Sequence, residues 1–404
     1  MQSRTLAEHA YQAVWRTLGP AVQAGLWSRG GPAADRLAER RGRTAQARPE
    51  GPLLVLHAAG RGETTAARAL AQGLREVGYE GTLLLTTSSP RSAPHSDPAL
   101  LHQYVPLDDR RFVARFLEHW RPDAVAIVAA DLWPNFVGEA ARRGIPLALC
   151  SAAVSERTAR RWSGVARPLG KAMFPRFDAA MAVDDEHAAR LVELGAPGAD
   201  PLGCLKTAAP SLPVDRALVQ QLRRASAGRL IVAVACTHAD TEGAVLDAIC
   251  RPDRLTLIAP RYPDRWTGGP TVPRRSRSGL PGIGQDRWLC DTYGELGSLY
   301  AAADVVVLGG AFADHGGHNP AEPARFGKPV VTGPDMRANA RTASELRDVG
   351  ALVQVETLQG LGDAVDRLAA DRDDRARRGD AATTLSEAWS ERRRTAARRL
   401  LSLT

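Results

Sequence analysis

The amino-acid sequence predicts an α/β protein with two domains, each built around a parallel sheet. Short apolar runs alternate with segments of helical periodicity along most of the chain, which is typical of βαβ units. The alternation pauses once, in a proline-rich stretch at residues 201–215, and this pause indicates a junction. A chain of 404 residues is long enough for two or three domains.

Before the junction, the apolar runs are predicted to be buried strands because they are short and bounded by turn residues. They lie at residues 52–58, 82–87, 123–130, 145–150 and 178–183. Between the first two, residues 63–78 carry helical periodicity and end at a glycine, as helices commonly do.

After the junction the same pattern resumes, and the chain ends in helix. The predicted strands lie at residues 229–236, 254–260, 304–310, 328–333 and 351–355. The predicted domains are a helix at 1–30, an N-terminal sheet domain at 31–205, a C-terminal sheet domain at 206–385 and a basic helix at 386–404. The arginines of that last helix suit a solvated face, with a dedicated binding role as the alternative.

The first thirty residues are predicted to form an amphipathic helix. Its apolar stripe comprises Leu6, Ala10, Ala13, Val14, Leu18, Val22 and Leu26. Such a stripe suits a helix that lies in a membrane interface. The alternative is a helix docked on its own domain or on a partner.

Charge and cysteine usage narrow the class of protein. The net charge of +8 favours an anionic partner, whether nucleic acid, membrane surface or phosphorylated ligand. A nucleic-acid-binding protein is disfavoured because no recognised motif accompanies the charge. The five cysteines are scattered and never spaced as CxxC, so a reducing cytosol without disulfides or structural zinc is expected. No apolar run is long enough to span a membrane.

Candidate site residues follow the predicted strands, because ligands bind outside the carboxyl ends of parallel strands. The first group is HAAGRGE, in which Gly60 and Gly62 let the backbone approach a ligand. Glu63 is either a general base or a carboxylate favoured at a helix N-terminus. In DLWPN, Asp131 is a second carboxylate for the same edge, with capping and packing as the alternative reading.

Cations from two different elements would suit a phosphate if they meet at the site. Lys206 lies at the domain junction, and Arg261 and Arg265 follow a strand. In residues 291–334, a loop with Gly316, Gly317 and His318 leads to Asn319 and a helix that carries Glu322. The start of that helix suits an anion, and Glu322 suits sugar hydroxyls. GxGxxG and Walker A strings are absent, so these residues indicate a two-domain enzyme for a nucleotide-linked anionic ligand.

With these blocks in view, the sequence over residues 52–355 resembles the 3-deoxy-D-manno-octulosonic acid (Kdo) transferases. The shared blocks are HAAGRGE, DLWPN, RRGIPLAL, SERTARRW, GCLK, CTHADTE, APRYPDR, DTYGEL and GGHNPAEPA. The resemblance implies a GT-B fold, with two Rossmann-like domains facing a central cleft and an N-terminal membrane-associated helix. It also implies inverting, metal-independent transfer of Kdo from CMP-Kdo to a lipid A precursor in lipopolysaccharide biosynthesis, without a cofactor, at the cytoplasmic face of the bacterial inner membrane.

The resemblance also assigns roles to residues. Glu63 becomes the general base, and Asp131 stands at the family's second acidic position. The donor-binding residues become Lys206, Arg261, Tyr293, Gly294, Glu295, Asn319 and Glu322. Gly60, Gly62, Gly316, Gly317 and His318 form the loops around the phosphate.

The chain departs from the family pattern at several of these blocks. Gly60 replaces the usual serine and Asp131 the usual glutamate, and Ser151-Ala152-Ala153 replaces Asn-Ala-Arg. Cys236, Tyr262 and Tyr293 replace serine, histidine and methionine. Two alternatives therefore stay open: a paralogue that transfers a related CMP-activated acid sugar to a different acceptor, and a catalytically silent sugar-nucleotide-binding protein at a membrane surface.

Overall fold

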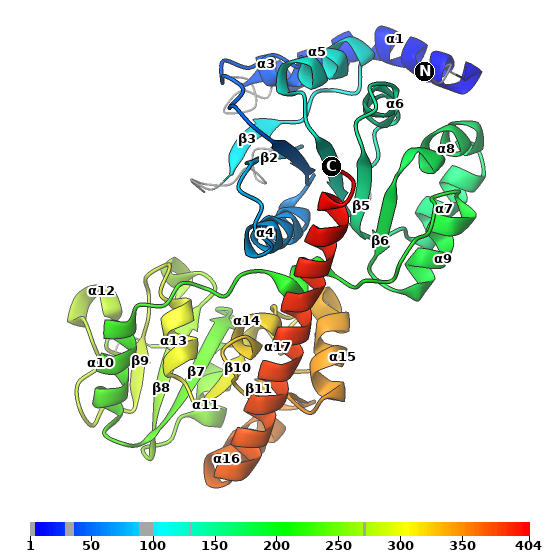
Figure 1. Cartoon of the computed structure of the whole chain (residues 1–404). Helices are drawn as coiled ribbons and strands as arrows, with labels where there is room; N and C mark the ends of the chain where they lie inside the picture. Colours follow the sequence, from blue (N-terminus) through cyan, green and yellow to red (C-terminus); the bar gives the residue numbers. More distant parts are fainter. Residues whose placement is uncertain (1–4, 29–35, 89–99, 130, 270–271) are drawn as a thin grey trace. The chain divides into compact units, whose positions relative to one another are not determined.

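The computed structural model describes residues 5–28, 36–88, 100–129, 131–269 and 272–404, and these fall into two compact units (Figure 1). The N-terminal unit comprises residues 1–210 together with 389–404, and the C-terminal unit comprises residues 211–388. The division therefore falls five residues after the predicted junction at 205, because the 3-10 turn η3 (Leu205–Ala208) packs on a helix of the N-terminal unit.

The N-terminal unit is built on a six-stranded sheet of order β3-β2-β1-β4-β5-β6. Its strands are β1 (Leu53–His57), β2 (Thr82–Thr87), β3 (Leu101–Tyr104), β4 (Ala124–Val128), β5 (Leu147–Ala152) and β6 (Ala179–Ala182), and all their pairings are parallel. Each predicted apolar run overlaps one of them, which confirms those predictions, although β5 extends two residues past the predicted end at 150. The sequence analysis did not predict β3, because a four-residue strand that reads LHQY lacks an apolar run.

Helices flank this sheet (Figure 1). They are α1 (Leu6–Ser28), α3 (Leu37–Arg40), α4 (Arg61–Glu76), α5 (Arg110–Trp120), α6 (Pro134–Arg142), α7 (Glu156–Ser163), α8 (Arg167–Met173) and α9 (Asp185–Glu193). Of these, α5, α6, α8 and α9 contribute buried apolar residues to the core of the sheet. Helix α5 shows how the sequence specifies them: the Asp109 side chain caps its first turn, and Phe116 and Trp120 on one face are fully buried.

The C-terminal unit repeats the same design, with a parallel sheet of order β12-β11-β10-β7-β8-β9. Its strands are β7 (Leu230–Thr237), β8 (Arg254–Pro260), β9 (Arg287–Leu289), β10 (Val305–Leu308), β11 (Val330–Thr332) and β12 (Leu352–Gln354). Its helices are α10 (Arg216–Ser226), α11 (Glu242–Ile249), α12 (Arg275–Ser278), α13 (Leu296–Ala302), α14 (Ala321–Ala324), α15 (Ala340–Asp348) and α16 (Leu358–Ala370). Five of the six strands overlap predicted runs, with β7 ending one residue past its run, whereas β9 overlaps none.

The last helix belongs to both units. Helix α17 spans Arg372–Leu401 without a break, so the segment 386–404 is the end of a 30-residue helix and not a separate one. Its residues from Trp389 onward belong to the N-terminal unit, where Trp389 and Leu400 are fully buried. The arginine-rich stretch is therefore partly a packing element.

Helix α1 is docked on the N-terminal unit through polar residues and exposes part of its apolar stripe. Glu8 is buried, and its carboxylate pairs with Arg176 at 2.7 Å and with Arg142 at 3.3 Å. By contrast, Leu6 is 90% exposed and Leu18 is 56% exposed. Among the described residues, no helix is sufficiently long and apolar to cross a membrane.

Candidate active site

In the N-terminal unit, the polar residues predicted for the site lie where β1 and β4 end. These two strands are neighbours in the parallel sheet, so the residues that follow them share one edge. His57, the last residue of β1, is buried and contacts the segment that follows β4, because its Nε2 lies 3.1 Å from Asp131 Oδ2. Its Nδ1 lies 3.0 Å from Thr86 Oγ1 of β2. Asp131 is thereby fixed to the end of β1.

The Asp131 carboxylate is an acceptor with several partners. Trp133 Nε1 donates to its Oδ2 at 3.0 Å and Ser88 Oγ donates at 3.3 Å. Burial raises the pKa of Asp131, but the bonds from His57, Trp133 and Ser88 outweigh it, so the pKa lies below its ordinary value. Asp131 is therefore an ionised group that orders this edge of the sheet, because its Oδ2 is already engaged by three donors.

The side chains of Glu63 and Lys206 both lie at the first turn of α4, where each packs against a glycine. Gly60 is the N-cap of this helix, and a Cβ there would lie 2.5 Å from Glu63 Oε2. A Cβ at Gly62 would lie 2.7 Å from Lys206 Nζ. The two glycines thus let a carboxylate and an ammonium approach the same helix start. The structure brings together Gly60, Gly62, Glu63 and Lys206, all named by the sequence.

In the C-terminal unit, three histidines meet at the ends of β7 and β10. His238 follows β7, and its Nε2 lies 2.9 Å from His318 Nε2. The ring of His315 is stacked on that of His238, with centroids 3.8 Å apart and planes 12° from parallel. Of these three, the sequence analysis gives a role only to His318, although His238 lies in the shared block CTHADTE.

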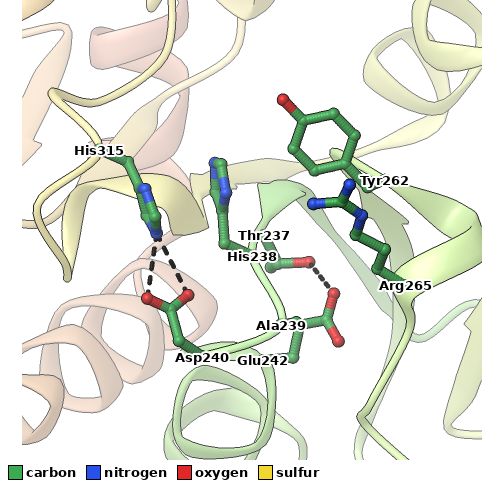
Figure 2. Close-up of a pocket in the computed structure, with 8 residues that line it drawn as sticks. All are labelled: Thr237, His238, Ala239, Asp240, Glu242, Tyr262, Arg265 and His315. Atoms are coloured by element: carbon green, nitrogen blue, oxygen red, sulfur yellow. Dashed lines mark hydrogen bonds and ion pairs between the residues drawn. The ribbon is translucent and has the colours of Figure 1, made fainter.

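A pocket of about 330 Å³ opens beside these histidines (Figure 2). Its lining residues are Thr237, His238, Ala239, Asp240, Glu242, Tyr262, Arg265 and His315. His315 Nε2 lies 3.0 Å and 3.2 Å from the two carboxylate oxygens of Asp240. The pocket therefore offers imidazoles, a carboxylate, an aromatic ring and a guanidinium at the carboxyl ends of two neighbouring strands.

Burial and neighbouring cations keep the inner histidines neutral. The pKa of His318 falls to about 4 because the ring is buried and because His238, Arg261 and His315 oppose a positive charge there. Burial, together with the nearby His315 and Arg261, also lowers the pKa of His238. The 2.9 Å contact between the two rings is therefore an N–H···N bond between neutral imidazoles near pH 7.

The glycine-rich loop before α14 packs too closely for side chains. Gly316 and Gly317 have φ angles of 77° and 71°, and a Cβ at Gly317 would lie 2.6 Å from the carbonyl oxygen of Asp335. After the loop, Asn319 Oδ1 accepts a bond from the N–H of Ala321 at 3.1 Å. Glu322 stands in the first turn of the four-residue α14, as the sequence predicted, and burial raises its pKa.

The remaining predicted donor residues lie on two other loops of this unit. Arg261 follows β8, and its guanidinium lies 5.2 Å from the ring centroid of Tyr262. Glu295 is the N-cap residue of α13, and its side chain pairs with Arg275 at 2.9 Å, so its carboxylate already has a cation partner. Next to it, Gly294 has a φ of 93° and the Tyr293 side chain is 75% exposed.

Sequence analysis assigned no role to three residues of the two sites: His57, His238 and His315. His57 nevertheless opens the block HAAGRGE, and His238 lies in CTHADTE. The first two directly end or follow a buried strand, and that position is a usable signal. His315 lies 77 positions after His238, and only the fold shows that their rings are stacked. Among the described residues, no group of His, Cys, Asp or Glu side chains has the arrangement of a metal site.

Comparison with known proteins points to one family. A family model described as 3-deoxy-D-manno-octulosonic-acid transferase (kdotransferase) matches residues 35–209. A 3-deoxy-D-manno-octulosonic acid transferase from Bordetella pertussis is 32% identical over 354 residues, which cover 80% of this chain and 82% of that protein. One from Haemophilus influenzae is 29% identical over 371 residues, covering 86% of each chain. The crystal structure of Acinetobacter baumannii MurG matches 87% of this chain and 100% of its own with a TM-score of 0.51 and 14% identity, which concerns the fold alone.

Proposed function

Because the chain belongs to the Kdo transferase family and has the GT-B fold of a glycosyltransferase, we propose that it transfers Kdo from CMP-Kdo to a lipid A-type acceptor in lipopolysaccharide biosynthesis. The observation that carries the proposal is the 32% identity over most of both chains. The geometry supports it, since Glu63 and the charged loops after β7, β8 and β10 all lie at carboxyl ends of strands.

In the proposed reaction, Glu63 is the general base. Its carboxylate takes the proton of the acceptor hydroxyl while the acceptor oxygen bonds to the anomeric carbon of Kdo. The bond between that carbon and the CMP phosphate oxygen breaks, and the electron pair leaves with CMP. A single displacement of this kind inverts the anomeric configuration. Lys206 lies over the same helix turn as Glu63 and supports charge that develops there.

The departing CMP is proposed to be held by the C-terminal unit without a metal or cofactor. Arg261 neutralises the phosphate, and the loop of Gly316 and Gly317 presents backbone to it. Glu322, with its raised pKa, and Asn319 are proposed to bond the ribose hydroxyls. Tyr293, Gly294 and Glu295 complete the nucleotide site in this proposal.

We also propose that the N-terminal unit rests on the cytoplasmic face of the inner membrane. The exposed apolar residues Leu6, Val14 and Leu18 of α1 and the fully exposed Val165 between α7 and α8 suit a lipid surface. Arginines of α7 and α8 suit the anionic headgroups beside them. Sedimentation with vesicles containing anionic lipid tests this proposal, and protein that stays in the supernatant contradicts it.

A paralogue with a different acceptor is the second candidate, because residues 151–153, which differ from the family pattern, lie at the site. Ser151 has a φ of 52° at the end of β5, and its Oγ accepts the N–H of Leu205 at 3.0 Å, next to Lys206. The segment thus holds η3 in place. Loss of transfer to lipid A precursor with CMP binding intact favours this candidate.

The base assignment is tested with Glu63→Gln. Because positioned general bases contribute roughly 10²- to 10⁴-fold, turnover is expected to fall at least about 100-fold. The affinity for CMP, measured by calorimetry, is expected to stay within about twofold. Glu80→Gln, at an exposed glutamate just beyond α4, is the matched control and should behave as wild type. Wild-type turnover in Glu63→Gln contradicts the assignment.

A further inference from the structure

The pocket beside the histidines in the C-terminal unit is distinct from the residues proposed for CMP. Of its eight lining residues, none belongs to the set assigned to the nucleotide above (Figure 2). Its volume of about 330 Å³ is in the range of small-molecule sites. It adjoins that set, because Tyr262 of the pocket directly follows Arg261.

The pocket contains one cation without an anionic partner. Among the carboxylates that the structure describes, none forms an ion pair with Arg265, whose guanidinium lies over the Tyr262 ring at 5.2 Å from its centroid. The two carboxylates of the pocket are already engaged: Asp240 pairs with His315, and buried Glu242 accepts from Thr267 N at 2.8 Å. Arg265 is exposed on the wall of the pocket and available to an incoming anion.

The opposite wall suits hydroxyl groups. Figure 2 shows Asp240 and His315 on one side of His238, and Tyr262 with Arg265 on the other. Asp240, His315 and His238 together offer both hydrogen-bond donors and acceptors. The Tyr262 ring, 43% exposed, offers an apolar face of the kind that packs against the carbon face of a sugar.

Two arginines contact one ring, and this geometry matches the donor's chemistry. Arg261 and Arg265 both lie 5.2 Å from the centroid of Tyr262. In a nucleotide-linked 2-keto acid sugar, the anomeric carbon carries both the carboxylate and the phosphate oxygen. Two anionic groups on one carbon require two adjacent cations, whereas a neutral sugar requires only the one at the phosphate.

We propose, on the basis of the proposed function, that this pocket binds the acid sugar of the donor, with Arg265 paired to its carboxylate. Asp240 and His315 bond its hydroxyls, and Arg261 remains the partner of the phosphate. Arg265 is then the residue that distinguishes an acid sugar from a neutral one, because a guanidinium binds a carboxylate through two parallel bonds.

The test compares two ligands that differ by the sugar. For Arg265→Gln, the KM for CMP-Kdo is expected to rise at least about tenfold, while the inhibition constant of CMP stays within about twofold. Arg265→Lys keeps the charge but loses the planar fork, so its KM for CMP-Kdo is expected to lie between those of the wild type and Arg265→Gln. Arg224→Gln, at an exposed arginine on α10 of the same unit, is the matched control and should leave both constants unchanged. Retained CMP binding also shows that each variant is folded.

Each other outcome overturns the inference. Equal weakening of CMP and CMP-Kdo in Arg265→Gln assigns this arginine to the nucleotide phosphate, and unchanged constants for both remove it from the site. A wild-type protein that binds CMP but gains nothing from the attached Kdo has no acid-sugar pocket. Failure of the proposed function looks different, because the wild type then transfers no Kdo, whether or not it binds CMP.

Discussion

Two glycines occupy the same position of two helices and differ only in what a methyl group would meet. Gly62 is the second residue of α4 and Gly243 the second of α11. A Cβ at Gly62 would meet Lys206 Nζ at 2.7 Å, whereas a Cβ at Gly243 would have nothing within 4 Å. The pair therefore separates the effect of a helical alanine from the effect of displacing Lys206.

Gly62→Ala is expected to lower turnover about tenfold without loss of stability. The end of a lysine side chain moves easily, so the alanine displaces Lys206 from the proposed site, while alanine in a helix stabilises by up to about 1 kcal/mol. Gly243→Ala should show the stability change alone. Thermal unfolding and steady-state kinetics of both variants check this, and equal turnover in the two would show that Lys206 does not need its observed position.

At the scale of elements, a buried carboxylate fixes α1. Burial raises the pKa of Glu8, but its bonds to Arg176 and Thr5 and the charge of Arg142 outweigh this and bring the pKa to about 2. The folded-state pKa thus lies below the ordinary 4.5, so the stabilisation is complete above pH 4.5 and is lost as pH falls toward 2.

Glu8→Gln is expected to destabilise the protein by up to about 3 kcal/mol at neutral pH, following roughly 1.4 kcal/mol per unit of pKa. Urea unfolding of wild type and variant at several pH values measures it. The difference between the two should narrow as the pH is lowered below about 4.5. A difference independent of pH would mean that the charge of Glu8 does not hold α1.

The end of α17 is held by a second ion pair, in which the arginine is buried and the glutamate is partly exposed. Arg393 is 8% exposed, and its guanidinium contacts both carboxylate oxygens of Glu76, at 2.5 and 2.9 Å, and the carbonyl oxygen of Ala208 at 2.9 Å. These bonds join α17, α4 and η3 within the N-terminal unit. Gly73 completes the contact, because a Cβ there would lie 2.5 Å from the carbonyl oxygen of Arg393.

Arg393→Ala is expected to cost about 2 kcal/mol, since it removes the charge-assisted bonds of a buried guanidinium to Glu76 and Ala208. Arg398→Ala removes an exposed pair with Glu391 on the same helix and should cost at most about 1 kcal/mol. Denaturant midpoints of the two variants give the comparison. Equal losses would indicate that the Arg393 pair contributes no more than a surface ion pair.

At the scale of the whole molecule, periodicity predicted the fold and could not predict the site networks. Buried parallel strands read as apolar runs, so ten strands are predicted from the sequence. Strands β3 (LHQY) and β9 (RWL) escape prediction because polar residues interrupt them. For α1 the sequence left two alternatives, a helix in a membrane interface and a docked helix, because an apolar stripe does not reveal that Glu8 docks the helix.

The site was predictable where its residues follow strands. Gly60, Gly62 and Glu63 follow β1, and the sequence analysis names them together with Lys206 of the junction, which lies beside Gly62. The bonds of His57 to Asp131 and of His238 to His318 join residues 74 and 80 positions apart, and such pairings depend on the order of strands in the sheet. The pocket around Arg265 depends on the same order.

The measurement that tests the central claim most directly is transfer from CMP-Kdo, generated in situ because it is labile, to a tetraacylated lipid A precursor in detergent. Mass spectrometry of the lipid counts the sugars added. The account predicts a product carrying one or more Kdo residues, formed by the wild type and lost in Glu63→Gln. A wild-type protein that forms no product and does not bind CMP would contradict the account.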